Sequence, residues 1–83
     1  MRIETVVSWF DNETELLAGE KNIDFVDLQI LKDIFLPEID DPLMYNPYDI
    51  LEKEANELKK HGVDIHFEFE KYSCQLDRFQ LPH

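Results

Sequence analysis

The 83-residue chain has little cysteine and little glycine, and each shortage excludes a class of protein. Cys74 is the only cysteine, so neither an internal disulfide nor a cysteine-rich zinc site can form. Gly19 and Gly62 are the only glycines, so the glycine-rich loops that cradle phosphates are absent, together with the common nucleotide-binding classes. A lone cysteine fits a reducing compartment, and we expect a cytoplasmic protein.

Long apolar runs are also missing. No stretch of about 18 uncharged apolar residues occurs, so no membrane-spanning helix is predicted. The first residues do not combine a basic start with an apolar stretch of about 7–15 residues, and we expect no export by a standard signal.

Basic residues are few as well. The chain has 19 acidic against 8 basic residues, and its formal net charge is -11. Nucleic acid and anionic membranes carry the same sign, so the sequence disfavours binding to either and indicates a basic protein as partner. A chain this short buries roughly 60–65% of the surface that its unfolded form exposes, which allows one domain over residues 1–83 and disfavours a large active site.

The N-terminal part of the sequence predicts a β-hairpin. Residues 3–10 are rich in β-branched and aromatic side chains and predict a strand. Residues 11–14 are turn formers, and residues 15–20 can return as a second, more polar strand. One face of the first strand is expected to carry Ile3, Thr5, Val7 and Trp9, and the other Val6 and Phe10.

Two helices and a loop are predicted next. Helical spacing of apolar residues predicts a helix over 25–36, with Asp24 as N-cap and Pro37 ending it. Residues 37–47 contain three of the four prolines and predict a loop. Its anchored side chains are expected to be Leu43, Met44 and Tyr45.

The second helix is predicted to begin at Asn46 as N-cap, with Pro47 in its first position, and to end before Gly62. Its buried stripe is expected to be Tyr48, Leu51, Ala55 and Leu58.

The C-terminal part predicts further strands. Apolar and polar residues alternate over 63–70, which predicts a strand with one packed and one acidic face. Residues 72–79 continue the alternation, either after a turn at Glu70 and Lys71 or within one long bent strand. The order ββααβ(β) predicts an α+β fold, a small antiparallel sheet of three to four strands with two helices on one face.

Surface carboxylates are the main candidate binding feature. Solubility alone could explain them, but a surface of one sign also costs stability through self-repulsion, which a basic partner would offset. Trp9 or Phe10 could anchor that partner. The carboxylates that we expect to contact it are Asp11, Glu13, Glu15, Glu20, Asp64, Glu68 and Glu70.

Catalysis and metal binding are less well supported. The carboxylate pairs Asp40/Asp41 and Glu68/Glu70 could act as acids and bases only in a desolvated pocket, of which the sequence gives no sign. The histidines and the cysteine match no common ligand spacing: His61, His66, His83 and Cys74. We therefore expect no enzyme, no cofactor and no metal, with Cys74 as a small core side chain.

Several segments resemble known immunity proteins. Residues 7–15 (VSWFDNETE), with Gly19-Glu20 and Asp24-Phe25 after them, resemble the opening of the cloacin immunity family, the small acidic antitoxins of ribosome-targeting colicins. Residues 69–72 (FEKY) resemble the closing part of that family. Residues 40–47 (DDPLMYNP) are similar to small bacterial proteins found beside polymorphic and contact-dependent inhibition toxins.

The resemblance implies an immunity protein, an antitoxin that binds and neutralises the nuclease domain, an RNase, of a bacteriocin or a contact-dependent effector. The alternative is a non-catalytic acidic adaptor or regulatory subunit that binds another basic protein, with weak, salt-sensitive association as its signature. An open sheet leaves a strand edge, so the chain could dimerise or add a strand of its partner, and a monomer or a weak dimer is expected.

Overall fold

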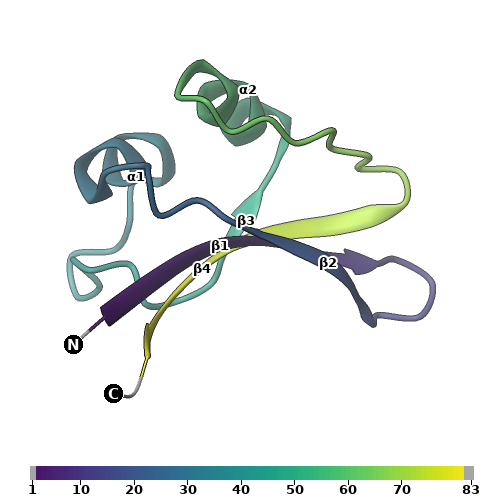
Figure 1. Ribbon diagram of the computed structural model, residues 1–83, viewed down its shortest axis with the longest axis horizontal. Coiled ribbons are helices and arrows are strands. Elements are labelled where there is room, and N and C mark those ends of the chain that lie inside the picture. Colours follow the sequence, from purple (N-terminus) through teal and green to yellow (C-terminus); the bar gives the residue numbers. More distant parts are fainter. Residues whose placement is uncertain (1, 82–83) are drawn as a thin grey trace.

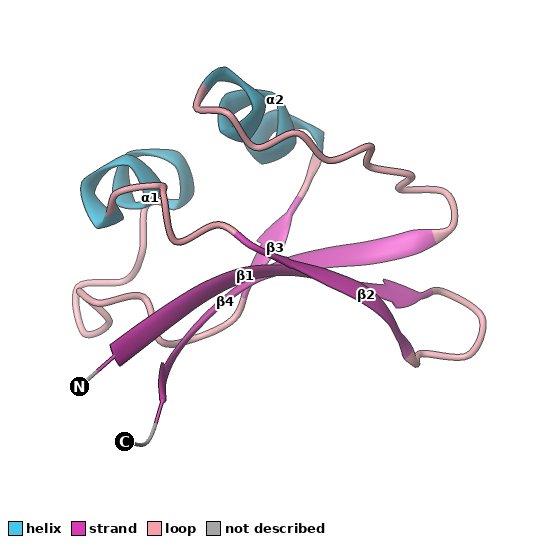
Figure 2. Ribbon diagram, viewed as in Figure 1, coloured by secondary structure: helices cyan, strands magenta, loops and turns pink. Residues whose placement is uncertain are grey.

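The computed structural model describes residues 2–81 and consists of one four-stranded antiparallel sheet and two helices (Figure 1). The sheet order is β2-β1-β4-β3, and both helices lie on the same side of it (Figure 2). The predicted α+β class is confirmed. The elements are β1 (Arg2–Asp11), β2 (Leu17–Asn22), α1 (Leu28–Phe35), β3 (Tyr48–Ile50), α2 (Glu52–Lys60) and β4 (Tyr72–Leu81).

The core lies between the sheet and the two helices. Val7 of β1 pairs with Leu76 of β4 at the centre of the sheet, and both side chains are fully buried. Leu31 of α1 and Leu58 of α2 cover them from the helix side, and Met44 reaches the same cluster from the loop between α1 and β3. The predicted strand over 3–10 thus becomes β1, one of the two central strands of the sheet.

The first helix begins later than predicted. Asp27, not Asp24, occupies its N-cap position, and α1 starts at Leu28. The Asp24 carboxylate instead accepts a hydrogen bond from the Thr5 amide at 2.7 Å, which ties the chain to β1. Phe25, where the helix was predicted to begin, is 60% exposed.

The second helix also begins later, because β3 precedes it. Tyr48 and Ile50 pair with Leu76 and Cys74 of β4, so the prediction of a helix from Asn46 onward was wrong. The edge of β4 offers backbone hydrogen bonds that a local cap signal cannot reveal. The predicted end was right: α2 stops at Lys60, and Gly62 follows with a φ of 90° that favours glycine.

Residues 63–70 do not form the predicted strand. They run over the helix side of the sheet, and Val63 is buried while Asp64 and His66 are exposed. The alternation therefore marked an extended backbone, but no neighbouring strand pairs with it. A turn follows, in which the Glu68 carbonyl accepts hydrogen bonds from the amides of Lys71 and Tyr72, so β4 starts after a turn.

The loop over 37–47 is confirmed, with one of its three expected anchors. Met44 is fully buried, whereas Leu43 and Tyr45 are exposed. The Asp41 carboxylate orders this loop by accepting hydrogen bonds from the amides of Tyr45 and Asn46.

Candidate binding surface at the hairpin end

Two turns that are far apart in the sequence meet at one end of the sheet, and Asn12 joins them. Its amide donates to the Lys71 carbonyl at 2.9 Å, and its side-chain Nδ2 lies 3.5 and 3.4 Å from the carbonyl oxygens of Phe69 and Glu70. The Ser73 hydroxyl donates to Asn12 Oδ1 at 2.6 Å. We call the two turns, residues 11–17 and 68–71, the hairpin end (Figure 1).

Asp11 shapes the first of these turns. Its carboxylate accepts hydrogen bonds from the amides of Glu13 at 2.8 Å and Thr14 at 3.1 Å. The bond from Thr14, followed by that from Glu13, lowers the pKa of Asp11, so this carboxyl stays charged. Asp11 therefore serves the turn itself, and Glu13 and Glu15 project from it as exposed side chains.

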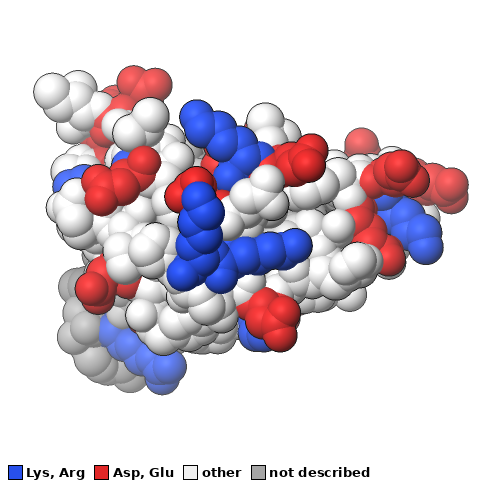
Figure 3. All heavy atoms as spheres, turned by 90° about the horizontal axis from the view of Figure 1, so that it is seen from above, with Lys and Arg blue, Asp and Glu red and all other residues white. Residues whose placement is uncertain are grey.

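The second turn adds Glu68 and Glu70. Glu68 lies 3.9 Å from Lys71 Nζ and 3.7 Å from His66 Nε2, so its charge is partly compensated. Within residues 2–81, no ion pair involves Glu13, Glu15 or Glu70. Acidic side chains gather at this end of the molecule in Figure 3. Three carboxylates from two segments thus stand uncompensated on one surface.

Exposed apolar side chains lie beside these carboxylates. Leu16 is 69% exposed and Leu17 is 53% exposed. Trp9, one of the two possible anchors, packs against the core, with its indole ring over Gly19. Phe10, half-buried, is opposite Leu17 across the strand pair. The leucines were overlooked, although two adjacent apolar residues at a turn break the alternation of a half-buried strand.

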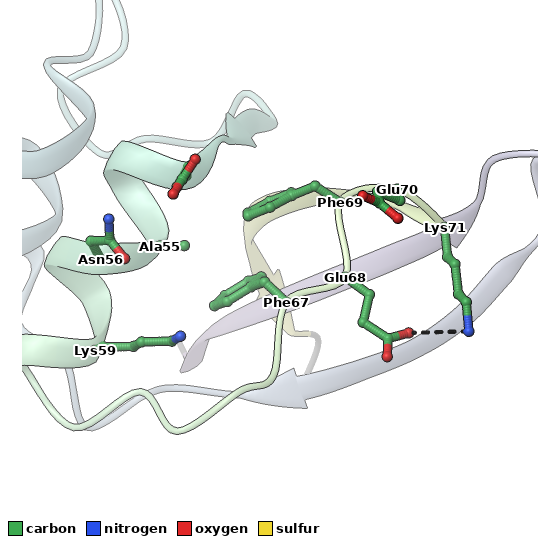
Figure 4. Close-up of a pocket in the computed structure, with 9 residues that line it drawn as sticks. Ala55, Asn56, Lys59, Phe67, Glu68, Phe69, Glu70 and Lys71 are labelled. Atoms are coloured by element: carbon green, nitrogen blue, oxygen red, sulfur yellow. Dashed lines mark ion pairs between the residues drawn. The ribbon is translucent and has the colours of Figure 1, made fainter.

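A groove of about 470 Å³ runs between α2 and the second turn (Figure 4). The rings of Phe67 and Phe69 stack in it, with centroids 5.6 Å apart and planes 7° apart. The α2 side contributes Ala55 and Lys59. The groove carries charges of both signs and an aromatic wall.

Two of the expected contact residues lie away from the hairpin end. Glu20 is exposed in the middle of β2. Asp64 is exposed on the extended segment, and its carbonyl accepts a hydrogen bond from Lys21 Nζ at 3.3 Å. The structure therefore brings Asp11, Glu13, Glu15, Glu68 and Glu70 together but not Glu20 and Asp64.

Cys74 is buried in the core, and burial raises the pKa of its thiol. Over residues 2–81, no three His, Cys, Asp or Glu side chains are grouped closely enough to hold a metal ion. His83 lies outside the described residues. Neither α1 nor α2 has the length and apolar character that crossing a membrane requires.

A family model matches residues 4–77, from near the start of β1 into β4. The chain belongs to the family described as Domain of unknown function (DUF7683). No curated protein and no solved structure matches it. The match includes both turns of the hairpin end, so the surface described above lies within the DUF7683 domain.

Proposed function

We propose that this DUF7683 domain is an immunity protein that binds and neutralises a basic nuclease toxin, an RNase of a bacteriocin or of a contact-dependent inhibition system. The observation that supports the proposal is the hairpin end, where Glu13, Glu15 and Glu70 stand uncompensated beside the exposed Leu16 and Leu17. The protein would act in the cytoplasm, where RNA is the substrate to be protected.

The chemistry of a nuclease explains why we propose one as the partner. A nuclease holds phosphates with lysine and arginine side chains, and carboxylates attract the same groups. Complementary charge accelerates encounter, and buried apolar side chains at the centre of an interface slow dissociation. A domain with carboxylates around two exposed leucines can therefore cover the surface that the nuclease uses for RNA.

The test is co-expression of the full chain with the polypeptide encoded immediately upstream of its gene. We expect the two to co-purify at high salt, and the upstream polypeptide to stop growth when expressed alone. A harmless or separately eluting polypeptide would contradict the immunity function, and weak, salt-sensitive, micromolar association would favour the acidic adaptor instead.

A charge-reversal variant locates the contact. Glu13→Lys with Glu15→Lys should weaken binding more than tenfold, because both side chains are exposed and make no ion pair in residues 2–81. Glu38→Lys with Asp40→Lys is the matched control, since it changes the charge equally in the exposed loop before β3. Equal weakening in both variants would show only an effect of net charge.

A further inference from the structure

The sheet has a second face that neither helix covers. Val7 and Leu76 point to the helices, so their alternate neighbours along β1 and β4 point the other way. We call this the open face (Figure 1). On β1 and β4 it consists of Arg2, Glu4, Val6, Ser8, Phe10, Ser73, Gln75, Asp77, Phe79 and Leu81.

A polar row crosses the open face from one edge of the sheet to the other. Ser8 is opposite Glu20 on β2 and opposite Gln75 on β4, and Gln75 is opposite Asp49 on β3. Three spacings between neighbouring strands place the two ends of the row about 14 Å apart. The row therefore has exposed carboxylates, Glu20 and Asp49, at its two ends.

A third carboxylate lies beside the middle of this row and is held in place. Asp77 Oδ2 accepts a hydrogen bond from the Ser8 hydroxyl at 3.1 Å, and Gln75 Nε2 lies 3.1 and 3.2 Å from the two Asp77 oxygens. Both donors are neutral, so they orient the carboxylate and leave its negative charge uncompensated. A side chain that is already ordered loses less entropy when a partner binds.

The basic residues of the chain lie away from this row. Four belong to the helices: Lys32, Lys53, Lys59 and Lys60. Figure 3, which views the helix side, shows several basic side chains on that side. Two strand residues turn to the helix side, where Lys21 bonds to the Asp64 carbonyl and Arg78 to Thr5 Oγ1 and the Leu43 carbonyl.

The other two basic residues do not neutralise the row either. Lys71 pairs with Glu68 in the turn before β4. Arg2 lies at the far end of β1, 3.8 Å from the Asp24 carboxylate. Within residues 2–81, the carboxylates of Glu20, Asp49 and Asp77 thus have no ion-pair partner.

Aromatic side chains flank the polar centre. Phe79 is 39% exposed and lies opposite Glu4, and Phe10 is half-buried opposite Ser73 towards the hairpin end. Aromatic contacts beside charged groups are the usual composition of a protein interface.

We propose that the open face is a docking surface for a basic protein, which places lysine or arginine side chains about 14 Å apart against Glu20 and Asp49 and a third against Asp77. This inference rests on the proposed function, because it assumes the same class of partner. It assigns a different surface, since neither turn of the hairpin end lies on the open face. Charge complementarity selects the occupant, because the helix side carries most of the lysines, whereas four carboxylates of the open face make no ion pair within residues 2–81: Glu4, Glu20, Asp49 and Asp77.

The first test needs no natural partner. The full chain, labelled with ¹⁵N, is titrated with hexa-arginine peptide, and the amide shifts of the sheet and the Gln75 side-chain amide are followed. We expect the largest shifts at Ser8, Gln75 and Asp77, and at least a fivefold loss of affinity in Glu20→Gln with Asp49→Asn. Shifts confined to the hairpin end or to the helix side would overturn the proposal.

The second test uses the polypeptide captured by co-expression. Glu20→Lys with Asp49→Lys should weaken its binding more than tenfold, whereas Glu38→Lys with Asp40→Lys should change it less than twofold. Asp77→Asn keeps an acceptor for Ser8 but removes the charge, and should weaken binding without lowering the melting temperature. Full affinity in the Glu20/Asp49 variant would overturn the open face as the docking surface while the immunity function still stood.

Discussion

The Tyr48 hydroxyl donates a hydrogen bond to the Asp41 carboxylate, and this contact joins the proline-rich loop to β3. Burial of the tyrosine, followed by its bond to Asp41, raises the pKa of Tyr48 to about 12. The same bond is the main cause that lowers the pKa of Asp41, and the amides of Tyr45 and Asn46 lower it further. One carboxylate thus orders the second half of the connection between α1 and β3.

Removing that carboxylate should destabilise the fold. Asp41→Ala leaves the Tyr48 hydroxyl and the amides of Tyr45 and Asn46 without their acceptor, and we expect the melting temperature to fall by about 5–10 °C. Thermal unfolding followed by circular dichroism measures the change. Tyr48→Phe is the smaller test, because it removes one of the three hydrogen bonds and should cause a smaller fall.

Acid should weaken the fold through Asp24 and Asp41. The bond from the Thr5 amide is the main cause that lowers the pKa of Asp24, and Asp41 is lowered as described above. A folded-state pKa below the unfolded value contributes stability above about pH 4, which is lost as the pH falls through the folded-state pKa.

Urea unfolding at pH 7 and at pH 3 tests this expectation. The wild type should lose more stability between the two pH values than the variant Asp24→Asn with Asp41→Asn. At pH 3 protonation of the other carboxylates reduces the repulsion between acidic side chains in both proteins. Comparing the two proteins therefore removes this shared effect. An equal loss in both proteins would contradict the assigned roles of these carboxyls.

Gly19 should not tolerate a side chain. A methyl group there would lie 2.5 Å from the Trp9 ring, so Gly19→Ala should lower the free energy of unfolding by about 1–3 kcal/mol. Chemical denaturation measures the loss. A double-mutant cycle with Trp9→Val should show that the cost of Gly19→Ala shrinks when the ring is absent, and independent, additive effects would argue against the contact.

Asn12 should control the order of the hairpin end. Asn12→Ala removes the side-chain hydrogen bonds to Phe69, Glu70 and Ser73 but keeps the backbone bond to Lys71. Amide exchange over residues 68–73 should become at least several times faster, because the second turn loses its tie to the first. Asn46→Ala in the exposed loop before β3 keeps the backbone bond to Asp41 and is the control, and it should leave exchange over residues 68–73 unchanged.

Local sequence features were enough to predict several elements of the fold. The β-branched run at the start predicted β1, the turn formers after it predicted the hairpin, and glycine after the basic last turn of α2 predicted where that helix ends. These features depend on neighbours along the chain, which a sequence displays directly. The carboxylates of Glu13 and Glu15 were visible for the same reason, since residues in a tight turn project into solvent.

Only the tertiary structure decided the rest. Residues 48–50 pair as a strand because β4 offers them an edge, and residues 63–70 remain unpaired because no strand lies beside them. The meeting of Asn12 with the turn before β4, and the row from Glu20 to Asp49, depend on strand order and register. Strand order and register are both determined by hydrogen bonds between segments far apart in the chain. A local pattern of residue types does not indicate which segments will pair.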